Sequence, residues 1–189
     1  MSKIALEGNA SGTGTFTVAS PNSNTNRTLT LPDNTGTIVT SASSITASQL
    51  PAGTILQVVS LYDATTSSSS GSYANIFGSN LSITLSSLSN KIYLLVTSPL
   101  STASNSGGAA DVGANMRIVR QTSGSAVELV VGRIRAQSLN DFNSPFALSY
   151  EDSSFAALTQ TYNVQFSRYG GNDAAFTQYT QFIAMEIKA

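Results

Sequence analysis

Between residues 54 and 189, apolar side chains alternate with polar ones over short segments that end at turn-forming residues. Leu81, Ile83 and Leu85, for example, are separated by Ser and Thr. This period of two predicts β-strands, because successive side chains of a strand point to opposite faces. No segment has the 3.6-residue period of an amphipathic helix. We therefore expect an all-β domain of seven to nine strands, folded as an antiparallel jelly-roll β-sandwich. The other alternating runs are 55–59, 92–96, 116–119, 127–134, 162–166 and 177–188.

One of these runs changes phase part-way. Val127, Leu129 and Val131 share one phase, whereas Ile134 falls in the other. Gly132 lies between them, so we expect a β-bulge at this glycine.

Residues 1–40 differ from the rest of the chain. They hold three short alternating segments, at 15–18, 27–31 and 37–40, separated by turns rich in Asn, Pro and Gly. Their large apolar residues are too few to offset the entropy of ordering forty residues in a single copy. We expect this short N-terminal β segment to pack against copies of itself or against another protein, and its candidate interface residues are Phe16, Val18, Leu29, Leu31 and Ile38.

Residues 41–53 form a linker by composition, being rich in Ser, Ala and Thr. Ile45 and Leu50 suggest a short helical turn within it, capped by Thr46 or Ser48. The expected organisation is therefore a segment at 1–40, a linker at 41–53 and a jelly-roll domain at 54–189.

Composition excludes several function classes. Only 10% of the residues are charged and the net charge is −1, so a basic face that binds nucleic acid is not expected. The chain has no Cys and no His, which removes disulfides, thiolate and imidazole metal sites, and Ser-His-Asp or Cys-His catalysis. No phosphate-binding loop is present either. We expect no catalytic residues, no metal and no cofactor.

The N-terminus lacks the apolar core of a signal peptide, and no apolar run is long enough to span a bilayer. We therefore expect a chain that is made in the cytoplasm and does not insert into a membrane.

Acidic residues offer the remaining route to catalysis. Asp141, Glu151 and Asp152 are the candidates for a glycosidase pair. Glu151 and Asp152 are adjacent, so in a strand they would point to opposite faces. We expect instead an exposed turn after Tyr150, and no enzyme.

Two further groups of residues have a functional and a structural interpretation. Arg117, Arg120, Arg133 and Arg135 could contact carboxylates of a partner or an acidic glycan, but we favour a solvated sheet face paired with Glu128. Among the aromatic residues, Tyr162 and Phe166 lie on strand phases and are expected in the core. Tyr169, beside two glycines, is expected at an exposed tip and is the candidate ligand contact.

Residues 12–40 resemble a segment that recurs in tail-fibre and other virion proteins of marine and cyanobacterial phages. The core of the match is the run RTLTLPDNTGT from Arg27 to Thr37. Downstream, the runs that begin at Gly53, Leu81, Ser89, Tyr162 and Met185 resemble the domains that follow this segment in such proteins. Those domains are similar to trimeric jelly rolls of the tumour-necrosis-factor and C1q kind.

The resemblance implies a structural protein of a bacteriophage particle, of the tail-fibre or tail-appendage type, that binds a host surface glycan or receptor. It also implies a homotrimer whose N-terminal segment attaches to another virion protein. The chain lacks the long repetitive shaft of typical fibres. A decoration protein of the capsid or neck, without a ligand, therefore remains the alternative.

Overall fold

The computed structural model describes residues 8, 10–15, 17–19, 22–26, 28, 30, 33, 35, 44–64, 67–69, 71–103, 111–122, 125–137, 142–169 and 174–189, and at some strand ends it describes the backbone only. The chain divides into two units, Met1–Thr40 and Ser41–Ala189.

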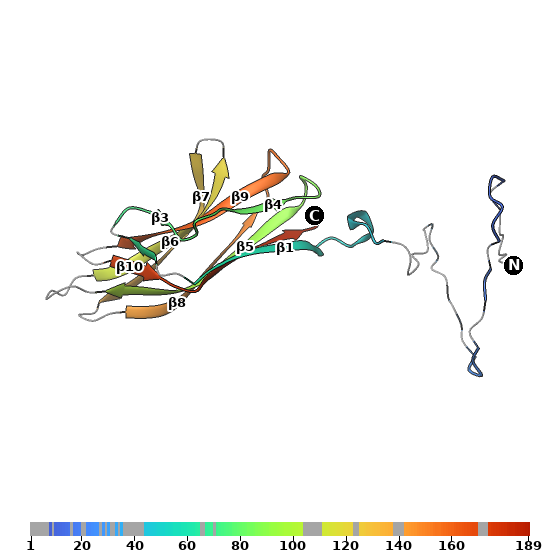
Figure 1. Cartoon of the computed structure of the whole chain (residues 1–189), viewed down its shortest axis with the longest axis horizontal. Coiled ribbons are helices and arrows are strands. Elements are labelled where there is room, and N and C mark those ends of the chain that lie inside the picture. The colour runs from blue at the N-terminus through green and yellow to red at the C-terminus, as the bar shows by residue number, and fades with distance from the viewer. Residues whose placement is uncertain are drawn as a thin grey trace. The chain divides into compact units, whose positions relative to one another are not determined.

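The described part of the second unit is almost entirely β-structure (Figure 1). It begins with a 3-10 helix at Ala47–Gln49, which confirms the expected helical turn. The Thr46 amide donates to the Gln49 side-chain oxygen at 2.8 Å, and the Lys188 ammonium donates to the Leu50 carbonyl. Within the described residues, eleven strands follow, more than the seven to nine that we expected. They are β1 (Ile55–Asp63), β2 (Ser67–Ser69), β3 (Ala74–Asn75), β4 (Leu81–Thr84), β5 (Lys91–Ala103), β6 (Asp111–Thr122), β7 (Ser125–Gln137), β8 (Phe142–Asp152), β9 (Thr159–Tyr169), β10 (Ala174–Thr177) and β11 (Thr180–Ile187).

The strand pairings are nested about the turn between β6 and β7. β6 pairs with β7, β5 with β8, β4 with β9 and β1 with β11, and each pair is antiparallel. This is the arrangement of a long hairpin rolled up on itself, which defines a jelly roll. The all-β fold and the antiparallel jelly-roll sandwich are thus confirmed.

The strands form two sheets that pack face to face. The first sheet has the order β1-β11-β5-β10-β2, with β8 on the other side of β5. The second sheet has the order β3-β9-β6-β7, with β4 also paired to β9. β1 and β8 are thus the edge strands on either side of the β11–β5 pair.

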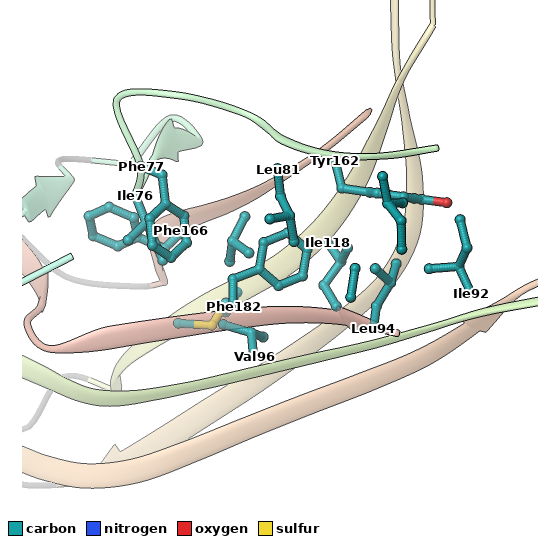
Figure 2. Close-up of a cluster of buried hydrophobic side chains, with 14 of the residues drawn as sticks. Ile76, Phe77, Leu81, Ile92, Leu94, Val96, Ile118, Tyr162, Phe166 and Phe182 are labelled. Atoms are coloured by element: carbon teal, nitrogen blue, oxygen red, sulfur yellow. The ribbon is translucent and has the colours of Figure 1, made fainter. Parts of the chain in front are cut away.

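The core lies between the two sheets (Figure 2). The first sheet contributes alternate residues of β5 and β11, and the second contributes alternate residues of β4, β6 and β9. Tyr162 and Phe166 are fully buried, as expected. Phe77, from the segment before β4, stacks on Phe182 with ring centroids 6.2 Å apart. The other fully buried large side chains are Ile83, Leu85, Ile92, Leu94, Val96, Met116, Ile118 and Glu186.

The phase change in β7 is real, but its position differs from our expectation. Ile118 faces Val130 and Val119 faces Glu128, so the extra residue of the bulge is Leu129. Gly132 pairs regularly with Met116. The reason for this glycine is space: a Cβ there would lie 2.5 Å from Cζ of Phe146, whose ring packs over the backbone.

Four of the described strands were not expected from the sequence, namely β2, β3, β8 and β10. β8 was missed because Pro145 and its polar neighbours resemble a loop, and proline is tolerated there because β8 is an edge strand. The serines of β2 were expected in a polar loop. They form backbone pairs with β10, which demand little of the side chains.

The N-terminal unit differs from expectation where it is described. Thr15, Thr17 and Val18 are exposed and are not in a strand. A short segment with few apolar residues has no partner strand to pair with in a single copy. The other expected strands, 27–31 and 37–40, lie mostly outside the described residues.

Candidate oligomer interface

The outer face of the first sheet is largely apolar. Its members are the residues that alternate with the buried ones along β1, β11, β5 and β8, so they point away from the core. Val58 and Tyr62 are 56% and 64% exposed. The apolar members are Val58, Tyr62, Ile183, Met185, Ile187, Tyr93, Leu95, Pro99, Pro145 and Ala147. We call this surface the apolar face.

Charge on the apolar face is confined to one end. Lys91 and Glu151 form an ion pair of 2.7 Å there, and both side chains are nearly half exposed. The remaining polar members carry no charge: Ser60, Gln181, Thr97 and Ser149. Removing a face of this composition from water costs little free energy, because it carries few charged groups that must be desolvated.

The outer face of the second sheet has the opposite character. Arg117 donates from Nη1 to Glu128 at 2.9 Å and from Nε to Gln165 at 2.9 Å. Its guanidinium also lies 3.7 Å from the ring centroid of Tyr73. Gln165 donates in turn to Asn75 at 2.9 Å. This polar ladder is typical of a surface in contact with water, and it confirms the expected pairing of Arg117 with Glu128.

A pocket of about 570 Å³ opens on the apolar face. Pro99 and Pro145 lie opposite each other on β5 and β8, and neither has an N–H to donate. Tyr179 borders the pocket from the turn before β11, is 55% exposed and has φ of 54°. Few residues with a side chain adopt this left-handed backbone conformation. The complete lining is Thr97, Ser98, Pro99, Pro145, Phe146, Ala147 and Tyr179.

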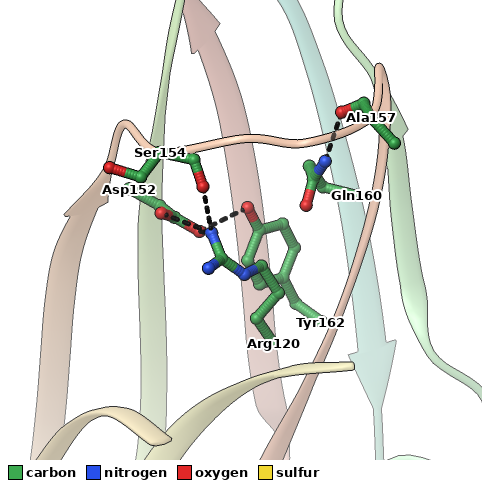
Figure 3. A network of polar contacts seen from close by, with 6 residues as sticks. All are labelled: Arg120, Asp152, Ser154, Ala157, Gln160 and Tyr162. Atoms are coloured by element: carbon green, nitrogen blue, oxygen red, sulfur yellow. Dashed lines mark hydrogen bonds and ion pairs between the residues drawn. The ribbon is translucent and has the colours of Figure 1, made fainter. Parts of the chain in front are cut away.

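A buried ion pair ties the two sheets together at one end of the sandwich (Figure 3). Arg120 of β6 donates from Nη1 to both carboxylate oxygens of Asp152, at the end of β8, at 2.9 Å each. It also donates to the Ser154 carbonyl, and the Tyr162 hydroxyl donates to Asp152 at 2.9 Å. Burial raises the pKa of Tyr162, and the charge and hydrogen bond of Asp152 raise it further. Tyr162 is therefore a permanent donor to the carboxylate.

This network corrects two expectations. Asp152 is not in an exposed turn, since it ends a strand and is 4% exposed. Arg120 does not lie on the solvated face with Arg117, because it reaches between the sheets to Asp152. Glu151 and Asp152 point to opposite faces and pair with different cations, as strand geometry requires. They cannot act together on one substrate, and Asp141 lies outside the described residues.

A second buried carboxylate lies on the same row of the first sheet. Glu186 is 1% exposed and accepts hydrogen bonds from Gln57 at 2.6 Å and from Asn90 at 2.7 Å. The Ser86 amide and hydroxyl donate to it at 2.7 and 2.8 Å. Burial alone would raise the pKa of Glu186, but the hydrogen bonds from Asn90, Gln57 and Ser86 outweigh it, and the pKa lies below its ordinary value. Glu186 thereby fixes the loop before β5 to β11.

The sequence-derived site residues are mostly not tested. Val18 is 80% exposed, whereas Phe16, Leu29, Leu31 and Ile38 lie outside the described residues. Tyr169 ends β9, but its side chain lies outside the described part. In the part that is described, no three acidic residues gather as a metal site would require, and no helix is long and apolar enough to cross a membrane.

Sequence reasoning missed the apolar face, although a signal was present. In β5 both phases are apolar between Ile92 and Val96, since Tyr93 and Leu95 alternate with the core residues. In β11 the phase of Ile183, Met185 and Ile187 points outward. A strand that is apolar on both phases belongs to a sheet that is covered on both faces.

No protein-family model and no curated protein matches the sequence. Among solved structures, the VP2 subviral particle of infectious bursal disease virus is similar to the chain with a TM-score of 0.34 and 12% identity, over 70% of this chain and 37% of that one. The Eiger TNF from S. frugiperda is similar with a TM-score of 0.34 and 9% identity, over 68% of this chain and 92% of that one. The chain thus spans little more than a third of the length of the viral protein. Likenesses this remote do not indicate what the chain binds.

Proposed function

We propose that the chain is a structural subunit of a bacteriophage particle and works as a homotrimer, with the apolar faces of three copies turned toward a threefold axis. The observation that carries this proposal is the contrast between the two outer faces of the sandwich. One bears the ladder around Arg117, and the other is largely apolar and carries no charge apart from the Lys91–Glu151 pair at its end.

An exposed apolar sheet face is expected to be buried against another protein surface. Soluble monomers rarely leave contiguous apolar patches larger than a few hundred Å² in water. The edge strands β1 and β8 flank this face, and each has an open edge that could pair with a foreign strand. Further copies of the same chain would cover both the face and its edges in one closed assembly. Three copies are the number implied by the resemblance to trimeric jelly rolls.

The N-terminal unit fits the same arrangement. Its few apolar residues cannot order forty residues in one copy, but three copies about an axis could share them. The resemblance of the run from Arg27 to Thr37 to virion proteins supports attachment of this unit to another protein of the particle. Low charge and abundant Ser and Thr suit an uncharged, hydroxyl-rich particle surface.

Within the particle, we propose a place on the tail, as a fibre or appendage that presents the jelly roll to a host glycan or receptor. Gold-labelled antibody against the purified chain, applied to intact particles, tests this location. Label at the tail supports the proposal. Label over the head or at the neck would contradict it and favour a decoration protein.

A pair of matched substitutions tests the role of the apolar face. Val58 on that face and Val131 on the outer face of the second sheet are 56% and 47% exposed. We expect Val58→Glu to dissociate the oligomer, because it places an unpaired carboxylate in the interface. Val131→Glu should leave the oligomer intact. Sedimentation velocity at equal concentrations measures both. Equal behaviour of the two variants would contradict the proposal.

A further inference from the structure

Two features of the apolar face are not explained by the general requirement that it be buried against another copy of the chain. One is Tyr62, which stands out from the edge strand β1 with 64% of its surface exposed. The other is the pocket between β5 and β8, bordered by Tyr179. A large exposed aromatic side chain and an apolar hollow are the two halves of a typical interface anchor.

Tyr62, which we call the knob, and the pocket lie at the same level along the strands of the first sheet. Tyr62 is opposite Gln181 on β11, Gln181 is opposite Thr97 on β5, and Thr97 is opposite Ala147 on β8. Thr97 and Ala147 both line the pocket. One cross-strand row therefore runs from the knob at one edge to the pocket at the other side of the sheet.

In a cyclic oligomer, this alignment would allow the knob of one protomer to contact the pocket of the next. Rotation about an axis moves no residue along that axis, so a knob can enter a neighbour's pocket only where both lie at the same level. An axis along the strands lets the whole length of β5 and β8 contribute to the interface. Successive protomers then meet heterologously, with the β1 edge of one against the β8 side of the next.

On the basis of the proposed homotrimer, we propose that Tyr62 of each protomer occupies the pocket of the next protomer, beside Tyr179 and over the rings of Pro99 and Pro145. The chemistry is complementary. Proline rings and the Ala147 methyl group offer an apolar surface for the phenol ring, and Tyr179 offers an aromatic partner. Thr97 is exposed and lines the pocket, so its hydroxyl offers a polar group to the Tyr62 hydroxyl.

Photo-crosslinking of the full chain tests this contact. Tyr62 is replaced by the photoreactive analogue p-benzoylphenylalanine, the purified protein is irradiated, and crosslinked dimers are digested and sequenced by mass spectrometry. We expect interchain crosslinks to peptides that contain Pro145 or Pro99. The same analogue at Val131, on the other outer face, should give no interchain crosslink.

Two substitutions complete the test. Tyr62→Ala should raise the concentration of half-dissociation about tenfold or more, as for other aromatic anchors, whereas Tyr62→Phe should keep most of the affinity. A trimer whose crosslinks from position 62 map elsewhere, or which tolerates Tyr62→Ala, would overturn the knob-and-pocket contact and leave the proposed function standing. A monomeric wild-type protein would overturn both.

Discussion

Removing one partner of the ion pair between Arg120 and Asp152 should be among the most destabilising single substitutions in the sandwich, because it leaves a buried charge unpaired. Arg120→Met removes the cation and keeps much of the aliphatic volume. The Asp152 side chain is 5% exposed, so it would remain as a buried carboxylate with only the Tyr162 hydroxyl bonded to it. The Ser154 carbonyl would lose its donor as well.

The expected magnitude follows from burial. Removing one partner of a buried ion pair costs about 3–5 kcal/mol. The Arg120 side chain retains 18% of its exposure, and water can partly replace it, so we expect the lower end, about 3 kcal/mol. Glu128→Gln is the matched control, because the ion pair of Arg117 Nη1 with Glu128 Oε2 (2.9 Å) lies on the outer face of the second sheet, away from the proposed interface, and the Glu128 side chain is 43% exposed. Breaking this surface pair should cost less than about 1 kcal/mol.

The measurement is urea-induced unfolding of wild type and both variants at one protein concentration, since the stability of an oligomer depends on concentration. A double variant, Arg120→Met with Asp152→Asn, should recover part of the loss because no unpaired charge stays buried. If Arg120→Met destabilises the protein no more than Glu128→Gln does, the assignment of Arg120 to the interior is wrong.

Two other substitutions test separate parts of the fold. Gly132→Ala should cost about 1–3 kcal/mol by forcing the Phe146 ring from its place, and the loss should be smaller in a Phe146→Ala background; equal losses in both backgrounds would contradict the contact. Glu186→Gln should destabilise the protein at pH 7, because its new amide group faces the donors of Asn90 and Gln57. The same variant should also lose an acid-dependent component of stability. The folded-state pKa of Glu186 lies below its ordinary value of 4.5, so its contribution is full above about that pH and is lost as pH falls through the folded pKa. Unfolding curves of wild type and variant between pH 3 and 7, about the range in which a glutamate titrates, provide the check, and parallel curves would contradict this role.

The sequence predicted the architecture well where one phase of a strand is apolar and the other polar. β4 and β9 were recognised because Leu81, Ile83 and Tyr162 alternate with small polar residues. β8 was missed even though Phe146 and Leu148 alternate, because Pro145 argued against a strand. Proline is tolerated at Pro99 of the central strand β5, where pairing changes from β11 to β10, and in edge strands, and edge position is a property of the whole sheet. It cannot be deduced from a local pattern.

The features that position the candidate interface depended even more on tertiary structure. Strand geometry places Asp152 and the adjacent Glu151 on opposite faces, but the cation that pairs with buried Asp152 comes from β6, which the local pattern does not indicate. The bulge was expected at Gly132 because glycine often marks bulges. The residue is a glycine instead because the Phe146 ring of another strand leaves no space for a Cβ there. The alignment of Tyr62 with the pocket depends on register across four strands, which no single segment encodes.

The mass of the purified full-length chain in solution tests the central claim most directly. Multi-angle light scattering over a range of concentrations measures it without assumptions about shape. The account predicts a single species of three times the chain mass of 19.6 kDa, stable on dilution into the low micromolar range. A protein that stays at 19.6 kDa, or that forms a dimer at every concentration, would contradict a homotrimer built on the apolar face.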